Sequence, residues 1–235
     1  MDGTKFPTQL FNLLLLGCSL SELRGLDEAE QVFAELIDNC LRTGNRFHLG
    51  AAYGNRAWLW AARGDADKTV DDLRRVIQIA RESGQAHLER VVTHNLAEHR
   101  LWEGALDEAL QLARRGYTLQ SRAGEGKTRT DRLLLARVLA ALDRRGELAE
   151  LLATFANETG LTDDEQTLLA VPRGVAHGQD ADWTAGLASL PSLFTQLRLE
   201  VGHLAAKHGH LTGPLRQEII ALARTDGLWA RRVAE

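Results

Sequence analysis

Glycine recurs almost every twentieth residue over the first two thirds of the chain, and this spacing constrains the fold more than any other feature. The glycines concerned are Gly25, Gly44, Gly64, Gly84, Gly104, Gly124, Gly146 and Gly160. The segments between them are rich in Leu and Ala at helical spacing and show no strand-like alternation. Because glycine readily takes the left-handed conformation that ends a helix, the spacing predicts helix pairs in a repeated unit of about forty residues, which stack into a solenoid.

The amino-acid composition agrees with an all-α fold. Of the 235 residues, 44% are hydrophobic, 6% are aromatic and only four are proline. Leu, Ala, Arg and Glu dominate, and these residues favour helices. The chain is long enough and apolar enough to bury a core, either as one large domain or as one short superhelix.

Charge is unevenly placed along the chain. The net charge is −4, so no overall basic field attracts nucleic acid. Residues 1–40 carry two basic and seven acidic side chains, whereas residues 111–145 carry nine basic and three acidic ones. An acidic end and a basic middle favour oriented docking of a charged partner; solvated helix faces are the simpler alternative.

The two cysteines, Cys18 and Cys40, are too few for a disulfide framework, and reduced thiols in a cytoplasmic protein are expected. The stretch LFNLLLLGC resembles a bacterial lipoprotein signal with its lipid-attachment cysteine at Cys18, which is the alternative. Its leader is poor, because Lys5 is the only basic residue and Asp2 opposes it. No run reaches the roughly 18 apolar residues that cross a bilayer, so we expect a cytoplasmic protein with no membrane partner.

The turns between paired helices align in four copies. They read RGLDEAEQVF, RGDADKTVDDL, EGALDEALQLA and RGELAELLATF, beginning at Arg24, Arg63, Glu103 and Arg145. The second helices then open, at separations of 40, 40 and 42 residues, at Leu26, Ala66, Leu106 and Leu148. Three residues later come the mostly small Ala29, Thr69, Ala109 and Leu151. The matching close crossing in the first helices has Gly17, Ala57 and Ala97, with Leu139 as the exception.

These residues resemble the tetratricopeptide repeat (TPR), which has small residues at the same two crossings and a G-x-x-x-E-A turn. The usual unit has about 34 residues, so this chain is more similar to the longer-helix variants of kinesin light chains and of bacterial signalling ATPases and transcription regulators. The resemblance implies an all-α, right-handed α-solenoid of antiparallel helix pairs. It covers residues 6–160 well and residues 161–235 poorly. It implies no shared chemistry.

Residues 1–160 are predicted to form four TPR-like hairpins, with helices over 6–24, 27–43, 46–63, 66–83, 86–103, 106–122, 128–145 and 147–159. Residues 161–235 are interpreted as a degenerate fifth repeat followed by C-terminal capping helices. Thr162 and Glu165 form a capping-box start for a helix near Asp163, which Pro172 should end or kink. Further helices are expected over 180–189, 192–208 and 214–225, with Pro214 in a first turn and Trp229 in a tail that caps the last pair.

No motif in the sequence indicates an active site. The stretch SRAGEGKT over 121–128 resembles the end of a phosphate-binding loop, but it lacks the first glycine and follows a helix in place of a strand. His94 and His99 are five residues apart, which is the wrong spacing for metal ligands on one helix face. Neither cysteine has the context of a nucleophile. We therefore expect no catalytic residue, no metal site and no cofactor.

The resemblance points to the concave surface, which the first helix of each pair lines in TPR proteins. By register the residues on this surface are Asn55, Trp58, Ala62, His94, Asn95, Glu98, Trp102, Arg137, Ala140 and Arg144. Asn55 and Asn95 are forty residues apart at one register position, where family members use an asparagine to hold a peptide backbone. Trp58 can anchor a partner. Alternatively the asparagines bridge neighbouring helices, and one of Trp58 and Trp60 belongs to the core.

The function predicted from these features is that of a non-enzymatic adaptor or regulatory subunit. It binds a partner protein segment in the groove, with acidic character favoured near Arg137 and Arg144. The alternative is a peptide or small-effector sensor module of a bacterial signalling regulator whose ATPase, kinase or transcription factor is a separate chain. RNA binding requires a positive groove, and the acidic first forty residues argue against it. An enzyme requires a pocket built by residues 161–235, and the oligomeric state stays open.

Overall fold

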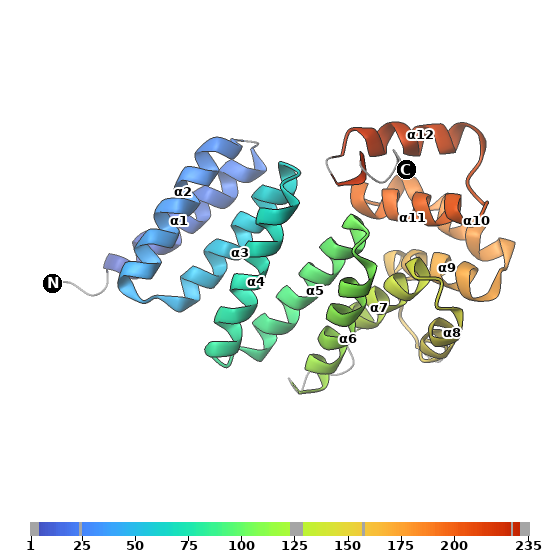
Figure 1. The fold of residues 1–235 in the computed structure, drawn as a ribbon, viewed down its shortest axis with the longest axis horizontal. Coiled ribbons are helices and arrows are strands. Elements are labelled where there is room, and N and C mark those ends of the chain that lie inside the picture. The colour runs from blue at the N-terminus through green and yellow to red at the C-terminus, as the bar shows by residue number, and fades with distance from the viewer. Residues whose placement is uncertain (1–4, 24, 123–128, 157, 227, 231–235) are drawn as a thin grey trace. The chain divides into compact units, whose positions relative to one another are not determined.

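The computed structural model describes residues 5–23, 25–122, 129–156, 158–226 and 228–230, and within these ranges the chain is helical with no β-strand. The elements in chain order are α1 (Lys5–Glu22), α2 (Leu26–Thr43), α3 (Arg46–Ala62), α4 (Ala66–Glu82), α5 (Ala86–Glu103), α6 (Leu106–Arg122), α7 (Arg129–Ala141), α8 (Arg145–Ala153), α9 (Asp163–His177), α10 (Asp180–Ala188), the 3-10 turn η1 (Leu190–Ser192), α11 (Thr195–Lys207) and α12 (Gly213–Arg224). The predicted all-α fold is confirmed (Figure 1).

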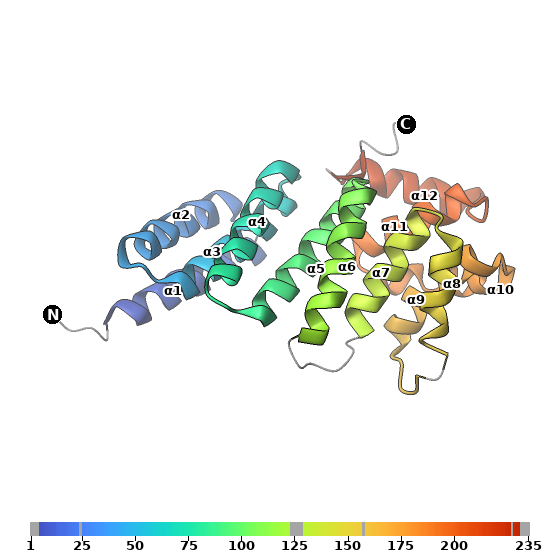
Figure 2. The same cartoon turned by 60° about the horizontal axis from the view of Figure 1, so that its bottom comes forward.

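Two compact units divide the chain, Met1–Leu96 and Ala97–Glu235, and the boundary falls inside α5. In the first unit α1 packs on α2, α2 on α3, and α3 on α4, while α1 also contacts α3. In the second unit α6 packs on α7, and α7 contacts both α8 and α9. The pairs α9–α10 and α11–α12 complete that unit. Figure 2 shows the successive helices of each unit lying side by side.

Four of the predicted glycine stops are confirmed. Left-handed backbone, with φ between 66° and 85°, follows a helix at Gly44, Gly64, Gly84 and Gly104. Gly160 also has a positive φ, of 73°, but it is not the predicted stop, because the helix predicted over 147–159 is α8 and ends at Ala153. Gly25 differs, because it precedes α2 with φ −77°. Gly146 differs as well, because it lies inside α8 and the turn before that helix is made by Asp143, at φ 56°. Gly124 and most of the SRAGEGKT stretch lie outside the described residues.

The fourth repeat has a different register from the one predicted. In the first three repeats, the N–H of the small residue in the first turn of the second helix donates to the carbonyl oxygen of the residue just before that helix. The pairs, donor first, are Ala29–Gly25, Thr69–Asp65 and Ala109–Ala105. The equivalent bond in the fourth repeat joins Leu148 to Arg144. Leu148, and not Leu151, is therefore the fourth member of the series. The sequence alignment was misled because Gly146 was taken for the turn.

The close crossing of α1 and α2 confirms the predicted role of Gly17. A Cβ atom added at Gly17 would lie 2.8 Å from Cε1 of Phe33 on α2. Phe33 itself is fully buried, so its ring has little room to move. Ala57 and Ala97, at the same register, are also buried.

The C-terminal region follows the predicted helices with one correction. The capping box is formed: Thr162 Oγ1 accepts from the N–H of Glu165, and the Glu165 side chain accepts from the N–H of Thr162. Pro172 does not end α9, which continues to His177 and stops at Gly178 with φ 68°. Pro172 is buried, and its packing offsets the backbone hydrogen bond that proline removes. Pro214 lies in the first turn of α12, as predicted.

The glycine contacts generate a paired stability prediction. Gly17→Ala should lower the free energy of unfolding by about 1–3 kcal/mol, because Phe33 must shift in a close-packed site. Gly146→Ala should raise it by roughly 0.4–1 kcal/mol, because the residue is helical, its Cβ would meet no atom within 4 Å, and alanine restricts the unfolded chain. Urea denaturation of both variants checks this. Equal effects of the same sign would contradict the packing described for Gly17.

Candidate functional site

Asn55 ties α3 to α1 in the first unit. Its Nδ2 donates to the carbonyl of Ala51 at 2.8 Å, and its Oδ1 accepts from the thiol of Cys18 at 3.3 Å. Burial and, to a smaller extent, Glu22 raise the pKa of the Cys18 thiol, so the thiol is protonated at neutral pH and acts as the donor. Asn55 therefore bridges neighbouring helices while its side chain stays partly exposed.

The two tryptophans of α3 have different surroundings. Trp60 is buried, and its Nε1 donates to Asp72 Oδ2 at 3.0 Å. Trp58 is 52% exposed and comes one helical turn after Asn55. The expectation that one of the two belongs to the core is confirmed for Trp60. Trp58 thus exposes a large apolar side chain next to an amide that bridges two helices.

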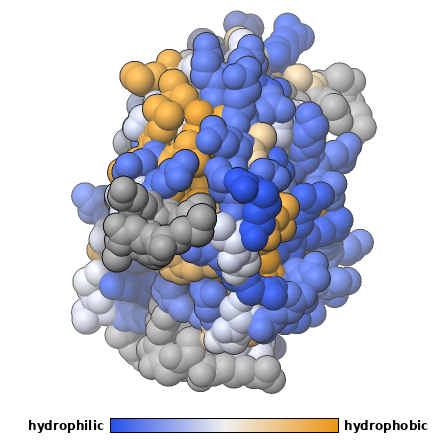
Figure 3. Space-filling model, turned by 90° about the vertical axis from the view of Figure 1, so that its left-hand side faces the viewer, coloured by the Kyte–Doolittle hydropathy of each residue, from blue (hydrophilic) through white to orange (hydrophobic). Residues whose placement is uncertain are grey.

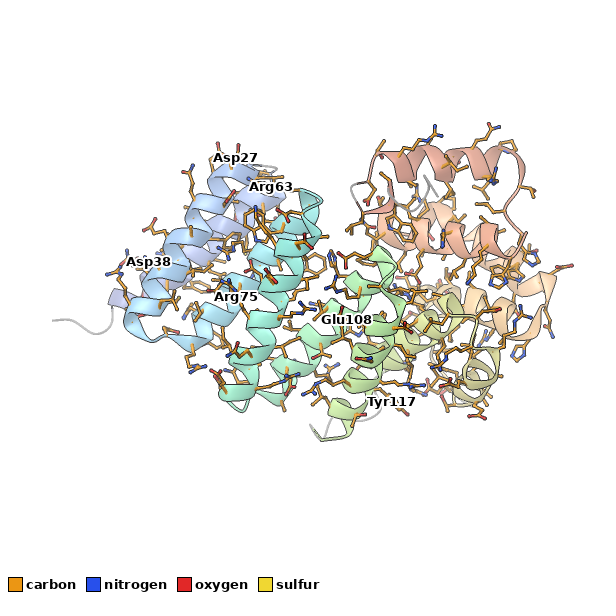
Figure 4. The ribbon with its side chains drawn as sticks, in the orientation of Figure 1. Asp27, Asp38, Arg63, Arg75, Glu108 and Tyr117 are labelled. Atoms are coloured by element: carbon orange, nitrogen blue, oxygen red, sulfur yellow. The ribbon has the colours of Figure 1, made fainter. Side chains whose placement is uncertain are left out.

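Ion pairs with the helices on both sides hold α3 in place. Arg56 donates to both oxygens of Asp72 on α4, at 2.7 and 2.9 Å. At the end of α3, Arg63 donates to Asp27 of α2 at 2.6 Å and also binds Glu30. Figure 4 labels Asp27 and Arg63 and shows them at the same end of the first unit. These contacts fix the orientation of α3 from both sides, so Trp58 is presented on a rigid element.

Two further predicted residues, His94 and Asn95, lie near the end of the first unit. Both are on α5 and both are partly exposed. Asn95 has the register of Asn55, forty residues later. His99, five residues after His94, is buried, with Nε2 3.5 Å from Glu103. No group of three or more potential metal ligands occurs among the residues that the structure describes.

In the second unit Arg137, Trp102 and Glu98 belong to one buried network. Arg137 Nη1 donates to Glu98 at 2.6 Å, and its Nε and Nη2 form a bidentate pair with Glu200 at 2.8 and 2.6 Å. Trp102 Nε1 donates to the same Glu200 carboxylate at 2.9 Å. Glu200 comes from α11, so this helix lies against the predicted groove residues of α5 and α7. Trp102 and Arg137 are therefore interior, and neither lines an open groove.

The electrostatics of Arg137 follow from this arrangement. Burial alone would lower the pKa of its guanidinium, but the charges of Glu200 and Glu98 and their hydrogen bonds outweigh burial and raise the pKa well above its ordinary value. Arg137 thus keeps its charge at every accessible pH. Two carboxylates of the same chain satisfy this charge.

Sequence reasoning missed Glu200. The signal was its position, because Glu200 comes three residues after Leu197 and four before Leu204, both of which are buried. A carboxylate at a core position of an amphipathic helix requires a buried partner. The last predicted residue, Arg144, does not lie on a first helix as predicted, because α7 ends at Ala141 and Arg144 directly precedes α8. Its side chain is 44% exposed and pairs with Glu147 at 3.2 Å. Of the two alanines, Ala62 is exposed and Ala140 is buried.

Comparison with solved structures identifies the fold. Two structures of a kinesin light chain-type protein from Podosopora anserina, described as having nearly identical TPR-like repeats, align with this chain. One is a single-substitution form with a TM-score of 0.63 and 18% identity, covering 88% of this chain and 99% of its own. The other has a TM-score of 0.61 and 18% identity, covering 87% and 99%. The fold is TPR-like.

No family model and no curated protein sequence matches the chain. Among the described helices, none combines the length and the apolar character that crossing a bilayer requires.

The Glu200 network predicts that replacing one carboxylate by an amide of the same shape strongly lowers the free energy of unfolding. Glu200→Gln should lower the free energy of unfolding by about 3–5 kcal/mol, because it removes the buried negative charge that faces Arg137 on two sides. The matched control is Glu82→Gln, which removes the exposed partner of Arg46 and should lower the free energy of unfolding far less, because solvent screens an exposed ion pair. Urea denaturation provides both values, and similar losses in the two variants would refute the network as a stabilising centre.

Proposed function

We propose that this chain is a non-enzymatic adaptor or regulatory subunit that binds a segment of a partner protein. The observation that carries the proposal is the half-exposed Trp58 beside Asn55, on a helix that ion pairs hold in place. A rigid aromatic side chain with an apolar body is the kind of residue that dominates binding energy in protein interfaces. The TPR-like fold supports this function, because its repeats bind proteins and share no chemistry.

We assign the partner-binding role to the predicted residues that are accessible. These are Asn55, Trp58, His94, Asn95 and Arg144. Asn55 already bonds Ala51 and Cys18, so one N–H of its amide and one lone pair of its Oδ1 remain for a peptide backbone. Trp58 supplies the apolar anchor. Arg144 supplies a positive charge for an acidic segment of the partner.

We assign a supporting role to Glu98, Trp102 and Arg137, which hold α11. Residues 161–235 then serve as a degenerate fifth repeat plus C-terminal capping helices. Trp229 supports this role: it is buried, and its Nε1 donates to Gln196 of α11 at 2.8 Å. Its ring lies 5.7 Å from that of His203, so the tail segment covers α11.

The experiment compares two exposed aromatic residues of the same helix. Trp58→Ala should remove at least one protein that the wild type captures from a lysate of the encoding organism, and should weaken that protein's affinity about tenfold or more once it is purified. The control is Phe47→Ala, because Phe47 is 68% exposed but lies near the start of α3, three turns away. Quantitative mass spectrometry of the captured proteins gives the readout.

Thermal midpoints separate binding from folding. Trp58→Ala should leave the midpoint within about 2 °C of the wild type, because an exposed side chain contributes little to stability. If both variants capture the same proteins as the wild type, α3 is not the binding element and the proposal fails.

A further inference from the structure

A cavity of about 190 Å³ lies between α11 and α12 in the second unit. Its floor is the crossing of the two helices, where a Cβ atom added at Gly202 would lie 2.7 Å from Cγ2 of Ile219. Both residues line the cavity. Apolar side chains also gather on the face that Figure 3 displays, but there they lie open to solvent. The α11–α12 cavity instead has apolar walls on two helices, so a small molecule inside it would be taken out of water.

The inner end of the cavity is apolar and held in place. Leu199, Ala223 and Trp229 line it, and each of them is 1% exposed. The indole Nε1 of Trp229 donates to Gln196 of α11 at 2.8 Å. The backbone N–H of Trp229 donates to Asp226 at 3.1 Å. Because these hydrogen bonds already order Trp229, the wall it forms can bind an apolar group at little further cost in entropy.

The outer end of the cavity carries a positive charge. The consecutive helices α11 and α12 run antiparallel (Figure 1), so Ala206 lies opposite Arg216, and both of these lining residues are exposed. Within the part of the chain that the structure describes, Arg216 has no hydrogen-bond or ion-pair partner, and the lining contains no Asp or Glu. The opening of the cavity thus offers a guanidinium with free donors, which favours a carboxylate.

The size of the cavity selects a molecule with one ring. An apolar cavity of about 150 Å³ accommodates benzene, so this one has room for one ring and a short substituent. The rings of His203 and Trp229 both line the cavity, and their centres are 5.7 Å apart. Aromatic side chains favour an aromatic ligand at this distance. A ring among the buried residues places its substituent toward Arg216.

We propose that the cavity between α11 and α12 binds a small aromatic carboxylate, with its ring against Trp229 and its carboxylate paired with the guanidinium of Arg216. This site is independent of the partner binding proposed for α3, because it uses no residue of that helix. Trp58→Ala should therefore bind the carboxylate like the wild type.

The test compares phenylacetate with its uncharged analogue phenylacetamide. In nitrogen–proton correlation spectra, phenylacetate should shift the indole signal of Trp229, which Trp229→Phe identifies, with a dissociation constant of about 1 mM or below. Phenylacetamide should bind about tenfold more weakly or worse, because it offers no charge to Arg216. In Arg216→Gln the affinity for phenylacetate should fall to that for phenylacetamide.

The matched control is Arg224→Gln, which removes an exposed arginine of the same helix that does not line the cavity. It should bind phenylacetate like the wild type. Ala206→Phe should fill the cavity and abolish the shift, while circular dichroism shows that its helices are kept. The proposal is overturned if phenylacetate up to about 10 mM leaves the Trp229 signal unmoved, or if phenylacetamide binds equally well. It is also overturned if Arg224→Gln weakens binding as much as Arg216→Gln.

Discussion

The close approach of two helices at a glycine is the interaction on which the pairs α1–α2, α9–α10 and α11–α12 depend. Gly17 receives the ring of Phe33, and Gly174 of α9 receives the indole of Trp183 on α10, where an added Cβ would lie 2.8 Å from the nearest atom in each case. Gly202 of α11 receives Ile219 of α12 in the same way, at 2.7 Å. The pairs α9–α10 and α11–α12 thus pack by the same device as α1–α2, although their sequences no longer follow the repeat.

Buried ion pairs add specificity to this apolar packing. Arg56 and Asp72 join the two helices of one pair, whereas Arg137 and Glu200 join helices that are 63 residues apart in sequence. A bidentate guanidinium–carboxylate pair is directional, so it selects one orientation of α11 among those that apolar contacts alone would permit. The core of the second unit is therefore determined by one long-range polar contact as well as by helix pairing.

Because of these contacts, positions that correspond in the repeat pattern differ in exposure to solvent. At corresponding positions of successive first helices, Trp58 is half exposed while Glu98 binds Arg137 in the buried network. The first unit therefore offers an accessible aromatic side chain where the second unit uses its residues internally. Intrachain contacts therefore decide which of the equivalent repeat positions stay accessible.

Local structure was predictable from the residues alone. The glycine spacing predicted the helix ends at Gly44, Gly64, Gly84 and Gly104, because the preference for a positive φ belongs to the glycine residue itself. The Thr162–Glu165 capping box was predictable as well, because its two residues are only three positions apart. The turn of the fourth repeat was predicted at Gly146, but the residue with left-handed backbone there is Asp143. Which of the predicted groove residues are accessible depends on contacts between helices that are far apart in the chain. Burial of Arg137 and Trp102 depends on Glu200, and no local pattern in α5 or α7 contains information about a helix so distant in the chain.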